Sequence, residues 1–216
     1  MTNNIKLIGV VGAGQMGLGI AQVFATSGFE VLLNDNNKIA LSNSSEVIKA
    51  NLKKAINKGR LDKDVGISSV KKIKSEFDIS QLGKCDLIIE AATEDEKIKH
   101  GIFKDLIPHL QPHTILTSNT SSISITRLAA RTDRPEKFMG CHFMKPAPVM
   151  QLVELVRGIA TNEETANCLK DLVKKIGKIS TNSEDFPAFI VNRILMPMIN
   201  EGIYVLYEGV GTVESI

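Results

Sequence analysis

The stretch IKLIGVVGAGQMGLGIAQVFA, residues 5–25, joins a short run of β-branched residues to a glycine-rich turn and then to a segment of helical period. Gly12 permits the tight turn, Gly14 lets a pyrophosphate approach the helix N-terminus, and Gly17 lets the helix pack closely on the strand. The strand–turn–helix context predicts a dinucleotide site made by Gly12, Ala13, Gly14, Gln15, Met16 and Gly17. The alternative is a glycine-rich turn in another kind of α/β protein.

Asp35 ends the next predicted strand, residues 29–35. A carboxylate at this place can accept hydrogen bonds from both ribose hydroxyls of adenosine, and it would repel a 2′-phosphate. We therefore expect the cofactor to be NAD rather than NADP.

Apolar strands continue to alternate with amphipathic helices along the rest of the chain. Helices are predicted at 39–60, 96–110 and 163–177, and strands at 85–92, 113–122 with its turn, 137–144, 150–156 and 178–184. This alternation predicts an α/β fold, a doubly wound, mostly parallel Rossmann-type sheet covered on both faces. We expect a boundary near 183–187, which divides an NAD-binding domain, 1–184, from a helical segment, 185–216.

Composition excludes several classes of protein. The net charge of +2 gives no strong field for nucleic acid or anionic membrane. The apolar runs are far shorter than the roughly 20 residues of a membrane span, and no signal peptide is recognisable. Three scattered cysteines, Cys85, Cys141 and Cys168, fit reduced thiols in a cytoplasm. His109 and His113 lie among prolines, so we expect no metal site.

The stretch GCHFMKPAPVMQLVELV, residues 140–156, places one acid inside an apolar run. An unpaired buried carboxylate is costly, so Glu154 needs a partner. If strands 137–144 and 150–156 are neighbours, Glu154 lies beside His142 and fixes its tautomer. The other ring nitrogen could then take a proton from a substrate hydroxyl. The alternative is a structural histidine and an edge-strand glutamate.

Taken in order, the motifs resemble those of 3-hydroxyacyl-CoA dehydrogenases, most nearly the short bacterial 3-hydroxybutyryl-CoA type. The resemblance runs from residue 5 to about 214 and rests on VVGAGQMGLGIAQVFA, the acid of LLND, IIEAATEDEKIKHGIF, SNTSSISIT, GCHFMKPAPVMQLVELV and FIVNRILMPMINE. It implies oxidation of a (3S)-3-hydroxyacyl-CoA by NAD, and the reverse reaction, in fatty-acid or butyrate metabolism. 3-Hydroxybutyryl-CoA is the substrate to which it points first.

The resemblance also implies roles for single residues. His142 would be the general base and Glu154 its partner. Ser121 would hydrogen-bond the substrate oxygen near the nicotinamide, and Asn192 would contact the thioester or 3-oxo group. The alternative for Ser121 and Asn192 is turn and helix-capping chemistry.

Further positions match cofactor and substrate contacts of the family. Glu94 and Lys99 match positions near the nicotinamide ribose. Asn51 and Lys58, in the basic helix 39–60, match positions that contact coenzyme A, although a solvated face is the usual meaning of such a run. Lys145 stands where the family has an asparagine that helps to hold the nicotinamide. A lysine has no acceptor and brings a cation near His142.

The last predicted helix, residues 188–209, is apolar on more than one side and has Pro197 as its expected kink. In the family this helix opens an all-α C-terminal domain that makes most of the dimer interface. The resemblance therefore implies a truncated C-terminal domain and a homodimer or larger homo-oligomer. Ala188 replaces a family glycine, a mild change unless the backbone needs a positive φ.

Two other functions stay open. One is a truncated, weakly active or non-catalytic dinucleotide-binding relative of the enzyme. The other is a β-hydroxyacid dehydrogenase that does not use coenzyme A.

Overall fold

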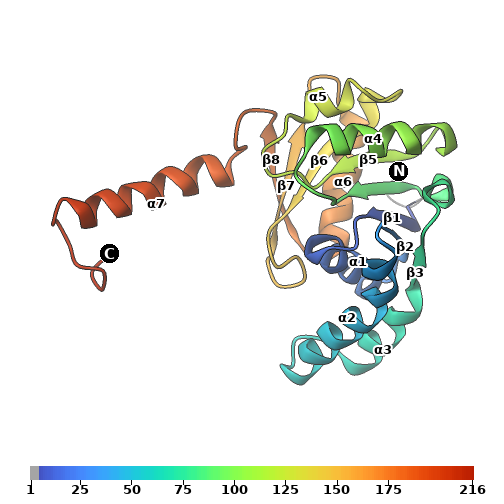
Figure 1. Ribbon diagram of the computed structural model, residues 1–216, viewed down its shortest axis with the longest axis horizontal. Helices are drawn as coiled ribbons and strands as arrows, with labels where there is room; N and C mark the ends of the chain where they lie inside the picture. Colours follow the sequence, from blue (N-terminus) through green and yellow to red (C-terminus); the bar gives the residue numbers. More distant parts are fainter. Residues whose placement is uncertain (1–4) are drawn as a thin grey trace.

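The computed structural model describes residues 5–216, and its centre is one eight-stranded sheet with the order β3-β2-β1-β4-β5-β6-β7-β8 (Figure 1). The strands are β1 Leu7–Val11, β2 Glu30–Asn34, β3 Ile73–Glu76, β4 Leu87–Glu90, β5 Ile115–Ser118, β6 Phe138–Phe143, β7 Leu152–Arg157 and β8 Ile179–Glu184. All neighbours are parallel except β6 and β7, which are antiparallel. The predicted doubly wound, mostly parallel sheet is confirmed.

Helices cover both faces of this sheet and enclose two apolar clusters. α1 (Gln15–Thr26), α2 (Lys38–Asn57) and α6 (Glu163–Lys175) contribute to one cluster, with Phe24 and Leu169 at its centre. α4 (Glu96–Leu106) and α5 (Ile125–Ala129) contribute to the other, which contains Phe103 and Phe138. Such double cover explains why the central strands are nearly continuous apolar runs rather than alternating ones, unlike the edge strands β3 and β8. Short 3-10 turns occupy Ile79–Lys84, Ile107–His109 and Pro135–Lys137.

Two helices, the short α5 and α3 (Lys63–Lys72), and one strand, β3, lack a counterpart in the sequence prediction. α3 and β3 follow α2 and complete the edge of the sheet beside β2. Among the four residues of β3 none is fully buried, so its sequence carries almost no apolar period. The pairing depends instead on tertiary contacts, such as the two hydrogen bonds from the Asn34 side-chain amide to the Glu76 and Phe77 carbonyls, 2.8 and 3.1 Å.

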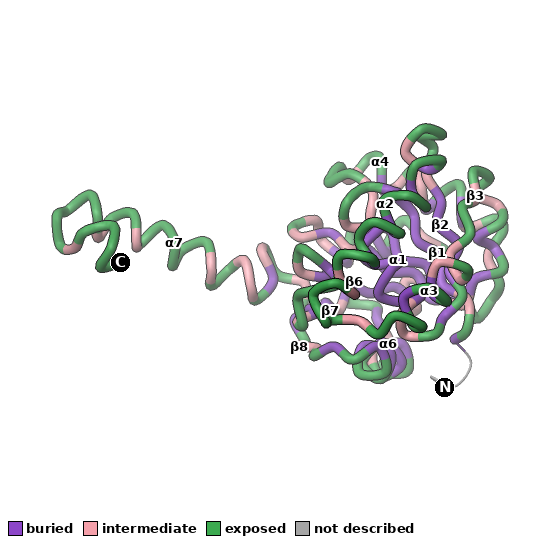
Figure 2. The backbone as a smooth tube through the Cα atoms, turned by 90° about the horizontal axis from the view of Figure 1, so that it is seen from below, coloured by how far each residue is buried: buried purple, intermediate pink, exposed green. Residues whose placement is uncertain are grey.

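The last helix, α7 (Val191–Tyr207), points away from the sheet, as Figures 1 and 2 show. It starts three residues later than predicted, because Ala188 and Phe189 adopt positive φ angles of 67° and 52°. The family glycine at position 188 is thus explained, and its replacement by alanine is not mild. α7 itself contains no buried residue, and Pro197 lies within it. In residues 5–216 we find no helix of the length and apolarity that would let it cross a membrane.

Candidate functional site

The glycine-rich turn lies at the carboxyl end of β1, where parallel sheets usually bind ligands. Gly12 has a φ of 108°, and a Cβ atom there would lie 2.6 Å from the Ala91 carbonyl oxygen. A Cβ at Gly17 would lie 1.7 Å from the Gly12 carbonyl oxygen, so the helix could not pack as it does. Around Gly14 nothing lies within 4 Å of such a Cβ, and Gly14 and Gln15 are exposed. The turn therefore leaves room for a pyrophosphate at the start of α1, as expected.

Asp35 follows β2 and closes one side of this turn. Its Oδ2 accepts a hydrogen bond from the Ala13 amide at 2.6 Å, and its Oδ1 accepts one from the Asn37 amide at 2.7 Å. These two bonds fix the carboxylate at the rim of the glycine-rich turn. The remaining lone pairs of both oxygens suit a pair of ribose hydroxyls. The residues of this corner fit NAD.

His142 and Glu154 face each other across the antiparallel pair β6–β7, where they are direct partners in the register. The distance from His142 Nδ1 to Glu154 Oε2 is 2.8 Å, and Glu154 is fully buried. An ionised carboxylate can only accept, so Nδ1 carries the proton and Nε2 has a free lone pair. The interpretation of the acid in the apolar run, which required β6 and β7 to be neighbours, matches this geometry.

The second oxygen of Glu154 holds the start of α7. Oε1 accepts hydrogen bonds from the amides of Ile190, at 3.0 Å, and Val191, at 2.9 Å. Burial alone would raise the pKa of Glu154, but the His142 hydrogen bond and these two amides outweigh it and hold that pKa below its usual value. The carboxylate is therefore charged at neutral pH and can stabilise an imidazolium.

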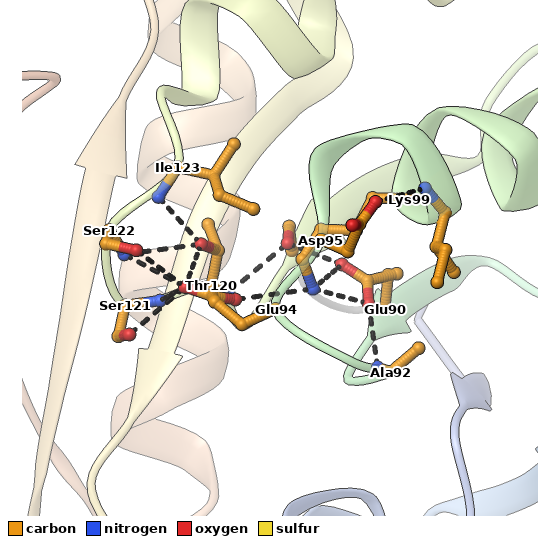
Figure 3. Close-up of polar contacts among 11 residues, drawn as sticks. Glu90, Ala92, Glu94, Asp95, Lys99, Thr120, Ser121, Ser122 and Ile123 are labelled. Carbon is orange, nitrogen blue, oxygen red and sulfur yellow. Dashed lines mark hydrogen bonds and ion pairs between the residues drawn. The ribbon is translucent and has the colours of Figure 1, made fainter.

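Ser121 lies in the loop after β5, and Glu94 organises that loop (Figure 3). Glu94 Oε1 accepts from the Ser121 amide at 2.9 Å and from the Ser121 hydroxyl at 3.1 Å. Thr120 and Ser122 donate to the same oxygen. Burial tends to raise the pKa of Glu94, but these bonds and the ammonium of Lys99 keep it lowered. One oxygen cannot satisfy so many donors well, so the serine hydroxyls are available to a ligand.

A fully buried ion pair between Glu90 and Lys99 lies to the right of Glu94 in Figure 3. Lys99 was expected near the nicotinamide ribose, but its partner Glu90 was not singled out from the sequence. The Lys99 ammonium contacts both oxygens of Glu90, at 2.7 and 2.8 Å, and Oε2 of Glu94 at 3.6 Å. The Ser118 hydroxyl and the Ala92 amide complete the partners of Glu90. The signal for Glu90 was the one used for Glu154, an acid in an apolar run, here IIEAA.

Two further contacts join the loops around the histidine. The Asn192 side-chain amide donates to the Ser121 carbonyl at 3.4 Å, so the first turn of α7 lies against the Ser121 loop. Asn119, in the same loop, accepts from the Phe143 amide at 2.8 Å. The structure thus brings His142, Glu154, Ser121 and Asn192 to one end of the sheet.

Three other predicted residues make no contact with the groups described so far. Asn51 and Lys58 belong to the exposed side of α2 and its C-terminus. Lys145 is exposed in the loop after β6, and among the described residues it makes no ion pair or side-chain hydrogen bond. The expected cation is therefore exposed, and no contact joins it to His142 or Glu154. Over residues 5–216 no group of three or more histidine, cysteine or acidic side chains is arranged to hold a metal ion.

The site can bind a dinucleotide at one corner and exchange a proton at the other. Nε2 of His142 could act as the basic group, with Glu154 to stabilise the positive charge on the imidazole, and the Ser121 and Asn192 side chains could supply hydrogen-bond donors. Cys141, the neighbour of His142, does not compete as a nucleophile, because burial raises the pKa of its thiol to about 12. This set of groups suits oxidation of an alcohol beside a hydride acceptor.

Comparison with known proteins shows the family to which the chain is similar. Residues 7–186 match the family model described as "3-hydroxyacyl-CoA dehydrogenase, NAD binding domain". The chain is 53% identical over 212 residues to a 3-hydroxybutyryl-CoA dehydrogenase of Bradyrhizobium diazoefficiens, which covers 98% of this chain and 72% of that protein. A probable 3-hydroxybutyryl-CoA dehydrogenase of Bacillus subtilis is 45% identical, with 98% and 74% covered.

A solved structure is also similar. The crystal structure of an (S)-3-hydroxybutyryl-CoA dehydrogenase from Ralstonia eutropha superposes with a TM-score of 0.93 at 41% identity. The match covers 99% of this chain and 75% of that one.

Proposed function

Because the chain belongs to the 3-hydroxyacyl-CoA dehydrogenase family, we propose that His142 and Glu154 perform the proton transfer of its reaction. That reaction is the NAD-dependent oxidation of a 3-hydroxyacyl-CoA to the 3-oxoacyl-CoA, and its reverse. The observation that supports the assignment is the 2.8 Å contact between His142 Nδ1 and the buried Glu154. The names of the relatives make 3-hydroxybutyryl-CoA the first substrate to test.

The chemistry follows from the free nitrogen of the imidazole. Nε2 of His142 takes the proton of the 3-hydroxyl group, while Glu154 keeps Nδ1–H in place and stabilises the imidazolium. NAD, when bound, supplies the acceptor for the hydride. In the reverse direction His142 returns the proton to the oxygen. The hydroxyl of Ser121 and the amide of Asn192 would stabilise the negative charge that builds on that oxygen.

The remaining positions are assigned to the two ligands. Asp35 would bind the adenosine ribose, and Glu94, Lys99 and Lys145 lie on the nicotinamide side in this proposal. Since Lys99 is only 1% exposed, its part would be to hold Glu94 and Glu90 rather than to reach far into the site. Asn51 and Lys58 would contact the phosphates of coenzyme A, because a flexible, exposed lysine is a suitable anchor for a phosphate.

The test is NADH oxidation with acetoacetyl-CoA. His142→Gln should lower kcat by about a hundredfold or more, since general base catalysis contributes on that order. Its affinity for NADH should be unchanged, because the glycine-rich corner is untouched. His113→Gln is the matched control, as His113 is exposed at the amino end of β5 and should keep full activity. Wild-type turnover in His142→Gln would refute the assignment.

A non-catalytic dinucleotide-binding relative is the second candidate, and Lys145 favours it. This residue replaces the asparagine expected on the nicotinamide side. Such a protein would bind NADH with normal affinity and show no turnover with acetoacetyl-CoA. Turnover with free acetoacetate that equals turnover with its coenzyme A ester would instead indicate a dehydrogenase that does not use coenzyme A.

We also propose a homodimer or larger homo-oligomer, a boundary between residues 1–184 and 185–216, and a cytoplasmic location in fatty-acid or butyrate metabolism. Support for a boundary in this region is that no residue after Phe189 is buried, although Phe189 itself packs on the sheet domain. The exposed apolar side chains of α7 support self-association. The three cysteines are free and buried, as in a reducing compartment.

A further inference from the structure

The first turn of α7 contacts three groups of the candidate site. The amides of Ile190 and Val191 donate to Glu154, and the Asn192 side chain donates to the Ser121 carbonyl. The ring of Phe189 lies edge-on to the imidazole of His142, with 6.0 Å between the ring centroids. The start of this helix is therefore part of the wall of the site.

The backbone just before α7 is held in an unfavourable conformation. Ala188 and Phe189 both lie in the left-handed region, at φ angles of 67° and 52°, although neither is glycine. Two such residues in succession persist only where surrounding contacts over-determine them. The turn formed by these two residues directs the first amides of α7 toward Glu154. The Glu154 carboxylate thereby caps the helix, which has no side-chain cap at its own N-terminus.

Phe189 is the contact that fixes this turn to the sheet domain. It is 3% exposed and packs in the apolar cluster that includes Ile125, Leu128 and Val156. No residue of α7 is buried, so beyond Phe189 the helix has no apolar anchor of its own on the sheet. Asp185 holds the preceding residues by accepting from the Ser124 hydroxyl and the Ile125 and Thr126 amides. The packing of the Phe189 side chain therefore fixes the position of the Ile190 and Val191 amides.

We propose that Phe189 is a positioning residue for the His142–Glu154 pair, which holds the Ile190 and Val191 amides on Glu154 and covers one side of the imidazole. This inference rests on the proposed function, because it assumes that His142 moves the proton. If the amides leave Oε1, the carboxylate is free to rotate about its last bond. Oε2 of Glu154 then no longer fixes the orientation of the His142 ring through Nδ1–H. As a result, Nε2 of His142 is no longer directed toward the substrate hydroxyl.

The test compares Phe189→Leu with Phe186→Leu. Phe186 lies three residues earlier in the same segment and is 66% exposed, so it controls for the loss of a phenyl ring. In Phe189→Leu we expect kcat with acetoacetyl-CoA to fall by about tenfold or more, because small misplacements of reacting groups cost that much. The KM for NADH should stay at the wild-type value. Phe186→Leu should match the wild type in both constants.

An NMR measurement on the ligand-free protein tests the same idea without turnover. The Nδ1 proton of His142 should give a downfield resonance that broadens in Phe189→Leu and stays sharp in Phe186→Leu. Unchanged kcat and an unchanged resonance in Phe189→Leu would overturn the inference. So would a parallel loss of NADH affinity, which would mean general loosening of the fold. If His142→Gln is inactive while Phe189→Leu is normal, only this inference fails; activity in His142→Gln removes the proposed function itself.

Discussion

At the scale of single residues, the backbone conformation of Ala188 destabilises the folded state, because its side chain clashes with the backbone at a positive φ angle. An alanine at positive φ brings Cβ close to the backbone, which costs roughly 1–2 kcal/mol. Glycine removes this clash but gives the unfolded chain more freedom, worth about 0.4–1 kcal/mol. Ala188→Gly should therefore raise the free energy of unfolding by about 0.5–1 kcal/mol, measured by urea denaturation.

Ala130 serves as a control, because its substitution by glycine should change the free energy of unfolding in the opposite direction. Ala130 is exposed at the end of α5 and has a φ of −62°. Ala130→Gly should lower the free energy of unfolding, since only the entropic term acts there. If Ala188→Gly lowered the free energy of unfolding as much as Ala130→Gly does, the assignment of a left-handed conformation to residue 188 would be refuted.

We expect Asp35 to determine which dinucleotide the glycine-rich corner accepts. Its carboxylate would face a 2′-phosphate with like charge, so NADH should bind more tightly than NADPH. Asp35→Ala should weaken NADH binding while the affinity for acetoacetyl-CoA stays the same, both measured by fluorescence titration. Because Asp35 also holds the Ala13 and Asn37 amides, Asp35→Asn is the milder partner variant. Equal affinity of the wild type for the two cofactors would contradict this role.

Single residues also show where sequence reasoning succeeds and where it stops. Glu154 could be paired with His142 because a buried acid needs a partner and only one histidine lay on a neighbouring strand. Glu90 obeys the same rule, but its partner Lys99 comes from a helix, and no strand register brings them together. The positive φ of Phe189 had no sequence signal at all, since phenylalanine rarely adopts it.

At the scale of elements, the Glu90–Lys99 pair joins β4, α4 and the end of β5. Removing one partner of a buried pair leaves an uncompensated charge and costs about 3–5 kcal/mol. Lys99→Met should lower the free energy of unfolding by about that amount. The double variant with Glu90→Gln should recover a large part of the loss, because the remaining charge is gone. Additive losses in this double-mutant cycle would show that the two side chains are not coupled.

Asp185 ties the start of α5 to the segment before α7, and this tie depends on pH. Burial tends to raise the pKa of Asp185, but the Ser124, Ile125 and Thr126 donors outweigh it and lower the pKa. A carboxyl with a depressed pKa stabilises the fold above its unfolded pKa, near 3.8, and loses this effect as pH falls through the folded value. Asp185→Asn should thus cost about 1 kcal/mol at neutral pH, the usual effect of a lost helix cap.

The measurement is urea denaturation of Asp185→Asn and wild type over a pH series. The difference between the two proteins should be constant at neutral pH and shrink as the solution is made more acidic than the unfolded pKa. A difference that grows on acidification would reverse the sign and refute the role of the charged carboxylate.

Buried elements such as β6 and β7, whose apolar residues form a clear pattern, could be predicted from the sequence. β3 and α3, which form mainly through contacts with neighbouring elements, could not. β6 and β7 are buried along most of their length, so their apolar runs were visible in the sequence. β3 exists because β2 offers it an open edge, and α3 because it lies against α1 and α2. The polar sequence 63–76 carries little of that information.

At the scale of the whole molecule, the sheet domain and α7 differ in how they are stabilised. The sheet domain contains two apolar clusters, whereas α7 projects from it and has no buried residue, as the colours of the tube in Figure 2 show. A helix of this kind gains stability mainly from packing, because propensity alone supports short helices poorly in water. The sheet domain packs against this segment at Phe189, just before α7 begins, and no residue of α7 itself is buried.

We expect the exposed apolar side chains of α7 to cause self-association of the protein. Ile194, Met198 and Ile203 are each at least 60% exposed, and burying such area contributes roughly 25 cal/mol per Å². We expect light scattering at micromolar concentration to show a dimer or larger species. Replacing Ile194 and Met198 together by lysine should shift it to monomer and leave NADH affinity unchanged. Asn200→Lys, an exposed polar position on the same helix, adds a similar charge without removing apolar area and should leave the assembly intact. A wild-type monomer with α7 fully helical would show that the helix needs no second copy.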